Sequence, residues 1–270
     1  MNYKLFYLLA LTLAVSCSKD GNRESAVQVH LALPGTATKV ALAGEDSGTF
    51  PLVWQEGDQV SLNGIMSGPM SAGLSGKDNA AFSFAGFSGS APYNLLYPGS
   101  ASGQVNLDGK TIALYSSADN LDQVFCMHHL CCGIRLSLTG DLSVATLTLS
   151  APGGEKIAGV FSTSFADGTL TEVSGGSTII IDYDTPVTLS GVPQSFYLFF
   201  APGTFSKGLS LKADNEHETI SREWRFASGH TLEKGKMYLL PETAFSSRDW
   251  DDGCIVELEG MSEDLINFEL

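Results

Sequence analysis

The chain has 270 residues, of which 17% are charged, and its formal net charge is -15. Binding to nucleic acid phosphates needs clustered Lys and Arg, and the sequence holds no such cluster, so this composition argues against a nucleic-acid partner. A chain of this length can bury the core of one large domain or of two small ones.

Residues 1–16 have the features of an export signal, because Lys4 precedes an apolar run that is too short to cross a bilayer. The run ends in LAVSC, which resembles the lipobox of bacterial lipoproteins. We therefore expect cleavage before Cys17 and acylation of this residue, which would anchor the chain to a membrane. The alternative is an ordinary signal peptidase that cuts nearby and leaves Cys17 free or removes it. Residues 17–25 are then a polar, lipidated tether.

From residue 26 to residue 245 the sequence consists of short alternating segments broken by Gly, Ser, Asp and Pro, without a sustained helical period. The first, VQVHLAL at 27–33, places Val27, Val29, Leu31 and Leu33 on one face. Comparable strands are predicted at residues 59–65, 80–87, 93–98, 110–115, 124–138, 144–149, 177–183, 186–191, 195–202, 208–213, 221–227 and 236–241. Turn signals recur about every 8–12 residues, which predicts an all-β fold of one or two sandwiches.

The polar segment SSADNLDQ, residues 116–123, is the best candidate for a domain junction. It divides an N-terminal β-sandwich at 26–118 from a C-terminal β-sandwich at 124–245. Residues 246–270 form an acidic tail that contains two β-prone pieces, CIVELE and LINFEL.

The sequence CMHHLCC, which begins at Cys126, could be a metal site or a strand with soft side chains. Within one strand over 124–138, His128 and His129 point to opposite faces, and Cys126 is a neighbour of His128 on one face. A structural zinc site draws paired ligands from two turns, and no second pair is visible. The favoured interpretation is a buried strand in which cysteine acts as a small apolar residue. A metal site, a redox role and a disulfide to Cys254 remain as alternatives; we predict no metal and no cofactor.

Catalytic patterns are incomplete. LDGKT at 107–111 lacks the Gly that a phosphate loop needs six residues before its Lys, and GSASG has Ala101 where a nucleophile elbow needs Ser. We therefore expect no enzymatic activity and no catalytic residue. A second function from another class is a surface glycan-binding lipoprotein, in which Trp54, Trp224 and Trp250 would form an exposed aromatic platform.

The order and spacing of five segments indicate a resemblance to a known family. The segments are VWQEGDQVSLNG (53–64), YNLLYPGS (93–100), HHLCCGIRLSLTG (128–140), SFYLFFAPG (195–203) and HTLEKGKMYLL (230–240). Together with the lipobox, they resemble the fimbrillin-like lipoproteins of Bacteroidota, which are fimbrial subunits and surface adhesins. The resemblance implies two transthyretin-like β-sandwich domains in tandem and a lipid anchor in the outer membrane. It also implies other fimbrial subunits as partners, and a host protein or a glycan as the receptor.

The resemblance further implies assembly by strand exchange. In this family a trypsin-like protease releases the first strand, and a strand from a neighbouring subunit fills the groove by β-augmentation. Carried over to this sequence, VQVHLAL is the released strand and Lys39 is the scissile residue, where family members commonly have Arg. Cleavage at the other basic residue, Arg23, would release the lipid without opening the groove. The candidate donor is LINFEL, with a frayed acidic tail as the alternative. Its apolar residues are Leu265, Ile266, Phe268 and Leu270.

Overall fold

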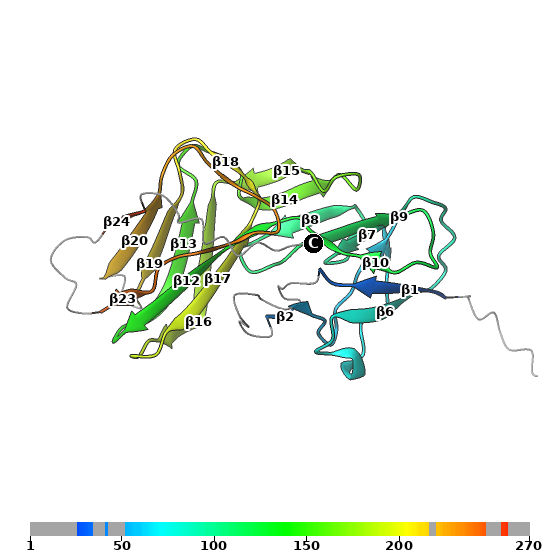
Figure 1. Ribbon diagram of the computed structural model, residues 1–270, viewed down its shortest axis with the longest axis horizontal. Helices are drawn as coiled ribbons and strands as arrows, with labels where there is room; N and C mark the ends of the chain where they lie inside the picture. Colours follow the sequence, from blue (N-terminus) through cyan, green and yellow to red (C-terminus); the bar gives the residue numbers. More distant parts are fainter. Residues whose placement is uncertain (1–25, 35–40, 43–51, 216–219, 247–254, 259–270) are drawn as a thin grey trace, which may run out of the picture.

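The computed structural model describes residues 26–34, 41–42, 52–215, 220–246 and 255–258. They form an elongated molecule in which almost every regular element is a β-strand (Figure 1), and the prediction of an all-β fold is confirmed. One 3-10 helix, η1 (Ala72–Leu74), is present. Within these ranges no helix has the length and apolar character needed to cross a membrane.

One half of the molecule is built mainly from strands in the first part of the chain. A three-stranded sheet has the order β10 (Phe125–Cys126), β1 (Val27–Ala32), β6 (Asn79–Phe84). A five-stranded sheet has the order β11 (His128–His129), β9 (Leu114–Ala118), β7 (Tyr93–Tyr97), β4 (Ser61–Leu62), β5 (Ile65–Met66). The short strands β2 (Ala41–Leu42) and β3 (Leu52–Val53) pair with each other.

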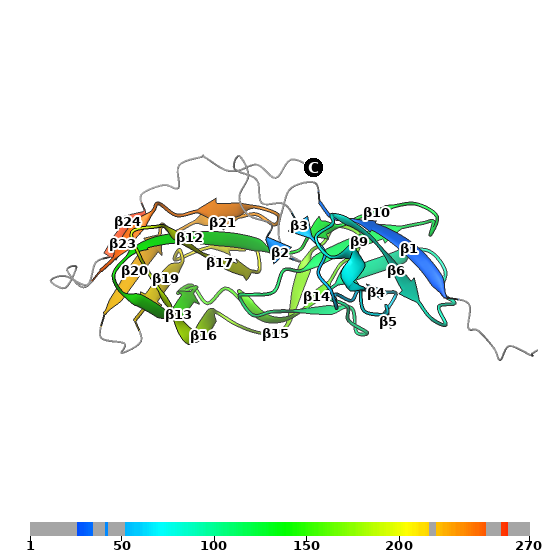
Figure 2. The same cartoon turned by 90° about the horizontal axis from the view of Figure 1, so that it is seen from below.

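The other half holds two larger sheets that pack face to face (Figure 2). The first has the order β17 (Gln194–Phe200), β12 (Cys132–Gly140), β22 (Met237–Leu239), and β23 (Thr243–Phe245) also pairs with β12. The second has the order β16 (Thr178–Thr188), β13 (Ser143–Ser150), β19 (Ser210–Asp214), β20 (Ser221–Phe226), β24 (Ile255–Leu258). A short ribbon pairs β18 (Gly203–Phe205) with β21 (His230–Leu232).

A third element joins the two halves. In the three-stranded sheet β15 (Leu170–Gly176), β14 (Ala158–Thr163), β8 (Gln104–Leu107), strand β8 precedes the predicted junction and the other two strands follow it. Beside this sheet the Lys234 ammonium donates to the Asp167 carbonyl and lies 5.6 Å from the centre of the Tyr115 ring. Because backbone pairing crosses the predicted junction, the boundaries of the two sandwiches stay a prediction.

The buried apolar residues fall into two clusters. The first contains Trp54 and Phe125 together with residues of β1, β6, β7 and β9. The second contains Trp224 and fills the space between the two larger sheets. The chain passes from the first core to the second between two adjacent residues, since Cys131 belongs to the first cluster and Cys132 to the second. Each half of the molecule therefore has its own apolar core.

Candidate strand-exchange site

Strand β1 lies between two other strands rather than at a sheet edge. It pairs antiparallel with β6 over six residue pairs, from Val27 opposite Phe84 to Ala32 opposite Asn79. On its other side it pairs parallel with β10. Two further backbone hydrogen bonds extend this pairing, because Leu33 donates to the Asp78 carbonyl at 2.8 Å and the Ala32 carbonyl accepts from Met127 at 2.9 Å. The first strand of the chain is thus held by main-chain bonds on both sides.

The side chains of β1 alternate as the sequence predicted. Val29 and Leu31 are fully buried, and Leu33, just after the strand, is 6% exposed. Gln28 and His30 point the other way and are exposed. Full burial of a Val or Leu side chain contributes about 1.5–3 kcal/mol, so these three residues bind β1 firmly to the first core.

The residues around β1 show what kind of groove its removal would expose. Phe82 and Phe84 of β6 and Phe125 of β10 are buried in the same core as Val29 and Leu31. Without β1, the facing edges of β6 and β10 would carry unpaired N–H and C=O groups above an exposed aromatic floor. Open strand edges of this kind recruit an extended segment by β-augmentation. A segment that took the place of β1 would therefore need apolar side chains at every second position.

Most residues predicted to act at this site lie outside the described residues. They are the lipidation residue Cys17, the basic residues Arg23 and Lys39, and the donor residues Leu265, Ile266, Phe268 and Leu270. The described chain stops at Pro34 and resumes at Ala41, so the predicted cleavage position falls in the interval that follows β1.

The first β-prone piece of the tail has a partner in its own chain. Within CIVELE, residues 255–258 form β24, which pairs parallel with β20 at the edge of its sheet, with Ile255 opposite Glu223 and Leu258 opposite Phe226. This pairing places the start of the tail on the second half of the molecule, away from β1 (Figure 1).

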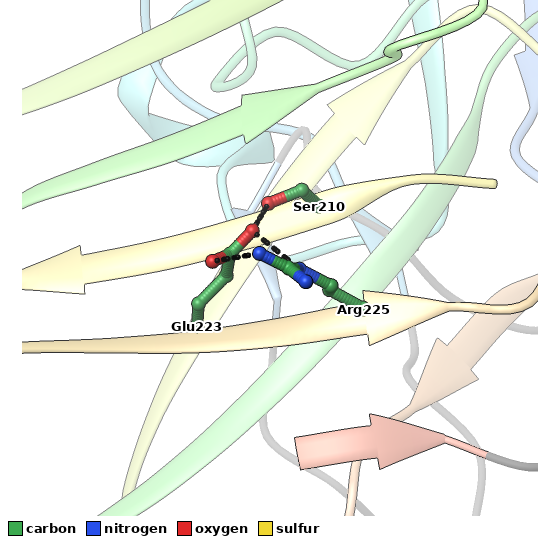
Figure 3. Close-up of polar contacts among 3 residues, drawn as sticks. All are labelled: Ser210, Glu223 and Arg225. Carbon is green, nitrogen blue, oxygen red and sulfur yellow. Dashed lines mark hydrogen bonds and ion pairs between the residues drawn. The ribbon is translucent and has the colours of Figure 1, made fainter. Parts of the chain in front are cut away.

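A polar cluster fixes the surface beside that edge (Figure 3). The Glu223 carboxylate accepts two hydrogen bonds from the Arg225 guanidinium, each 3.1 Å long, and a third from the Ser210 hydroxyl at 2.5 Å. The bonds from Arg225, and then the bond from Ser210, lower the pKa of Glu223 below its ordinary value. The carboxylate therefore stays charged at neutral pH and holds β19 and β20 together next to β24.

The prediction of one continuous strand over residues 124–138 is wrong. The segment is divided among β10, β11 and β12, because the chain passes from β1 to β9 and then into the second half to pair with β17. Cys126 and His128 are exposed, whereas the favoured interpretation buried them, and His129 is largely covered. Burial, and then the charge of His128, lower the pKa of His129 to about 4, so this imidazole is neutral at physiological pH.

Cys131 and Cys132 do act as small apolar residues, since both are buried. Desolvation raises the pKa of the Cys131 thiol to about 11, and the Cys132 thiol donates to the Phe200 carbonyl at 3.6 Å. Cys126, Cys131 and Cys132 form no disulfide with one another, and Cys254 lies outside the described residues. In the described part of the chain, no three His, Cys, Asp or Glu residues group closely enough to hold a metal ion.

This arrangement predicts selective thiol chemistry. Iodoacetamide should alkylate Cys126 at least about 100-fold faster than Cys131 or Cys132, because only an accessible thiolate reacts and burial suppresses both access and ionisation. Mass spectrometry of peptides from folded protein, compared with urea-unfolded protein, measures the difference. A Cys126→Ser variant is the control for assignment. Equal labelling of all three thiols in the folded protein would contradict the burial described here.

The aromatic platform of the glycan-binding alternative is not formed by Trp54 and Trp224, because both rings are fully buried in the two cores. Trp54 packs edge to face against Phe82 at 4.9 Å and against Tyr97 at 5.6 Å. Trp250 lies outside the described residues.

The fold and the inner position of β1 define a class: all-β proteins with two cores whose first strand completes a sheet. Solved structures share this fold. A "putative cell adhesion protein" of Bacteroides uniformis superposes with a TM-score of 0.50 at 13% identity, over 85% of this chain and 100% of the other. A second one, of Bacteroides ovatus, superposes with a TM-score of 0.52 at 13% identity, over 83% of this chain and 94% of the other. No protein-family model and no curated protein matches the chain. The predicted resemblance to fimbrillin-like surface proteins is confirmed at the level of the fold.

Proposed function

We propose that the chain is a non-enzymatic, lipid-anchored fimbrial subunit or fimbrillin-like adhesin of the cell surface, which assembles by exchange of its first strand. The observation that carries the proposal is the position of β1 between β6 and β10, with Val29, Leu31 and Leu33 in the core. The shared fold with the Bacteroides cell adhesion proteins supports a surface role. In this proposal Cys17 attaches the precursor to the outer membrane.

Cleavage after Lys39 would leave β1 joined to the protein by non-covalent contacts alone. These contacts would keep the cleaved β1 in place in an isolated subunit. In an assembly, a strand of a neighbouring subunit would replace β1, and because that strand is part of the neighbour's chain it would link the two subunits. LINFEL has the required pattern, because Ile266, Phe268 and Leu270 occupy every second position as Val29, Leu31 and Leu33 do. Since β24 is paired at the edge of β20, residues 259–270 follow from an anchored point and could reach about 40 Å when extended.

Limited proteolysis tests the proposal. The soluble form, residues 18–270, is treated with a trace of trypsin, and the new N-terminus is read by mass spectrometry and the assembly state by size. We expect one early cut after Lys39, followed by a ladder of multimers. A Lys39→Gln variant should stay uncut at this position and monomeric, and a variant without residues 265–270 should be cut but stay monomeric. A cut protein that never forms multimers would reject strand exchange.

A further inference from the structure

A cleft of about 300 Å³ opens at the border between the two halves of the molecule, because its lining includes Phe199 of the first core and Phe196 of the second. It lies where β16 and β17, the edge strands of the two facing sheets, leave the side of the second core open. Residues of both strands line it together with Lys110, which belongs to the loop before β9. Its volume is at the lower end of the range for small-molecule sites.

Aromatic rings form the walls of this cleft. Phe196 is buried at the floor, and the Tyr183 ring packs edge-on against it, with 5.8 Å between ring centres and 70° between ring planes. Tyr197 is a second half-buried phenol in the lining. The Phe196 contact therefore holds the Tyr183 ring in a defined orientation. Desolvation raises the pKa of Tyr183 to about 12, so its hydroxyl is protonated at neutral pH and can donate a hydrogen bond.

Polar groups form the rim. Gln194 and Lys110 are exposed, and Ser195 is half-buried between Gln194 and the apolar floor. The Lys110 backbone is fixed by a turn, because the Asp108 carboxylate accepts from the N–H groups of Lys110 and Thr111 at 2.9 and 2.8 Å. None of the described residues that line the cleft is acidic, although the chain as a whole carries a charge of -15.

This combination has a chemical consequence. The Gln194 amide nitrogen already donates to the Ser195 carbonyl at 3.3 Å. A purely apolar ligand would still cover the amide oxygen of Gln194 and the ammonium of Lys110 without giving them partners, which costs free energy. A sugar ring has an apolar face of C–H groups that packs on a phenol ring, and hydroxyls at its edge that bond to amide, hydroxyl and ammonium groups. We infer that the cleft between β16 and β17 binds one pyranose ring of a glycan. Tyr183 and Tyr197 contact the ring faces, and Gln194 and Lys110 bind the hydroxyls.

The inference goes beyond the proposed subunit role and does not depend on strand exchange, since no residue of β1 lines the cleft. Its test uses residues 18–270 with β1 retained. Cellohexaose, mannohexaose, xylohexaose and chondroitin hexasaccharide are titrated by calorimetry. We expect at least one of them to bind with a dissociation constant below about 1 mM.

Substitutions of the two tyrosines test whether the sugar binds in this cleft. Tyr183→Ala and Tyr197→Ala should each weaken it about tenfold or more. Tyr93→Ala is the matched control, because Tyr93 also packs on a phenylalanine, Phe87 at 6.1 Å, but does not line the cleft. It should leave binding unchanged.

The double variant Lys110→Ala/Gln194→Ala changes only exposed side chains, so it tests the site even if a tyrosine variant fails to fold. It should also weaken binding. Absence of binding by all four hexasaccharides would overturn the inference, and so would binding that survives the double variant. Occupation of the cleft by a peptide of residues 255–270 in place of the sugars would overturn it as well.

Discussion

Replacement of Trp224 by alanine is expected to lower the free energy of unfolding by about 3–5 kcal/mol. The Trp224 ring is fully buried in the second core, on a strand that pairs with β19 on one side and β24 on the other. Its Nε1 donates to the Thr243 hydroxyl at 3.4 Å, so the variant loses a hydrogen bond as well as packing. The cavity that remains between two sheets fixed by backbone pairing can close only in part.

Urea unfolding followed by far-ultraviolet circular dichroism measures this change, because the signal does not depend on tryptophan fluorescence. Val192→Ala is the control: its side chain is 72% exposed, and truncation there should change stability by no more than about 0.5 kcal/mol. A Trp224→Ala protein within about 1 kcal/mol of the parent would show that the second core does not depend on this ring.

Local alternation was sufficient to predict β1 and its buried face. The period-two pattern of Val29 and Leu31 is a property of consecutive residues, and it predicts which side chains are buried without any knowledge of the partner strands. The all-β class follows from the same kind of local information.

Features that depend on distant pairing were not predictable in this way. Alternation through CMHHLCC indicated one strand, but the segment pairs first with β1, then with β9 and then with β17. These three partners are distant in sequence, so local alternation does not contain the breaks between the strands. The hairpin β14–β15 was missed, because its strands are rich in Gly, Ser and Thr and expose most of β15. The cleft joins Tyr183 to Tyr197 only through sheet packing, which residue spacing does not contain.

A chain that begins at residue 40, and therefore lacks β1, is expected to lose the independent stability of the first core. Three buried side chains at about 1.5–3 kcal/mol each amount to about 5–9 kcal/mol, which is comparable to the total stability of a typical domain. Strand β6 would also lose all six of its residue pairs with β1. We expect this protein to self-associate and to melt at a lower temperature than residues 18–270, as measured by sedimentation and scanning calorimetry.

A peptide of residues 26–34 should reverse both effects, because a ligand that binds only the folded state stabilises it in proportion to the logarithm of its concentration. The matched control is the same peptide with Val29→Asp and Leu31→Asp. It keeps the length and the backbone groups but would bury two carboxylates without partners, so it should fail to bind. A peptide of residues 262–270 should compete with the native peptide if LINFEL is the donor strand. If the truncated protein instead melts at the same temperature as residues 18–270 and binds none of the three peptides, β1 is dispensable and its groove cannot be the place where subunits join.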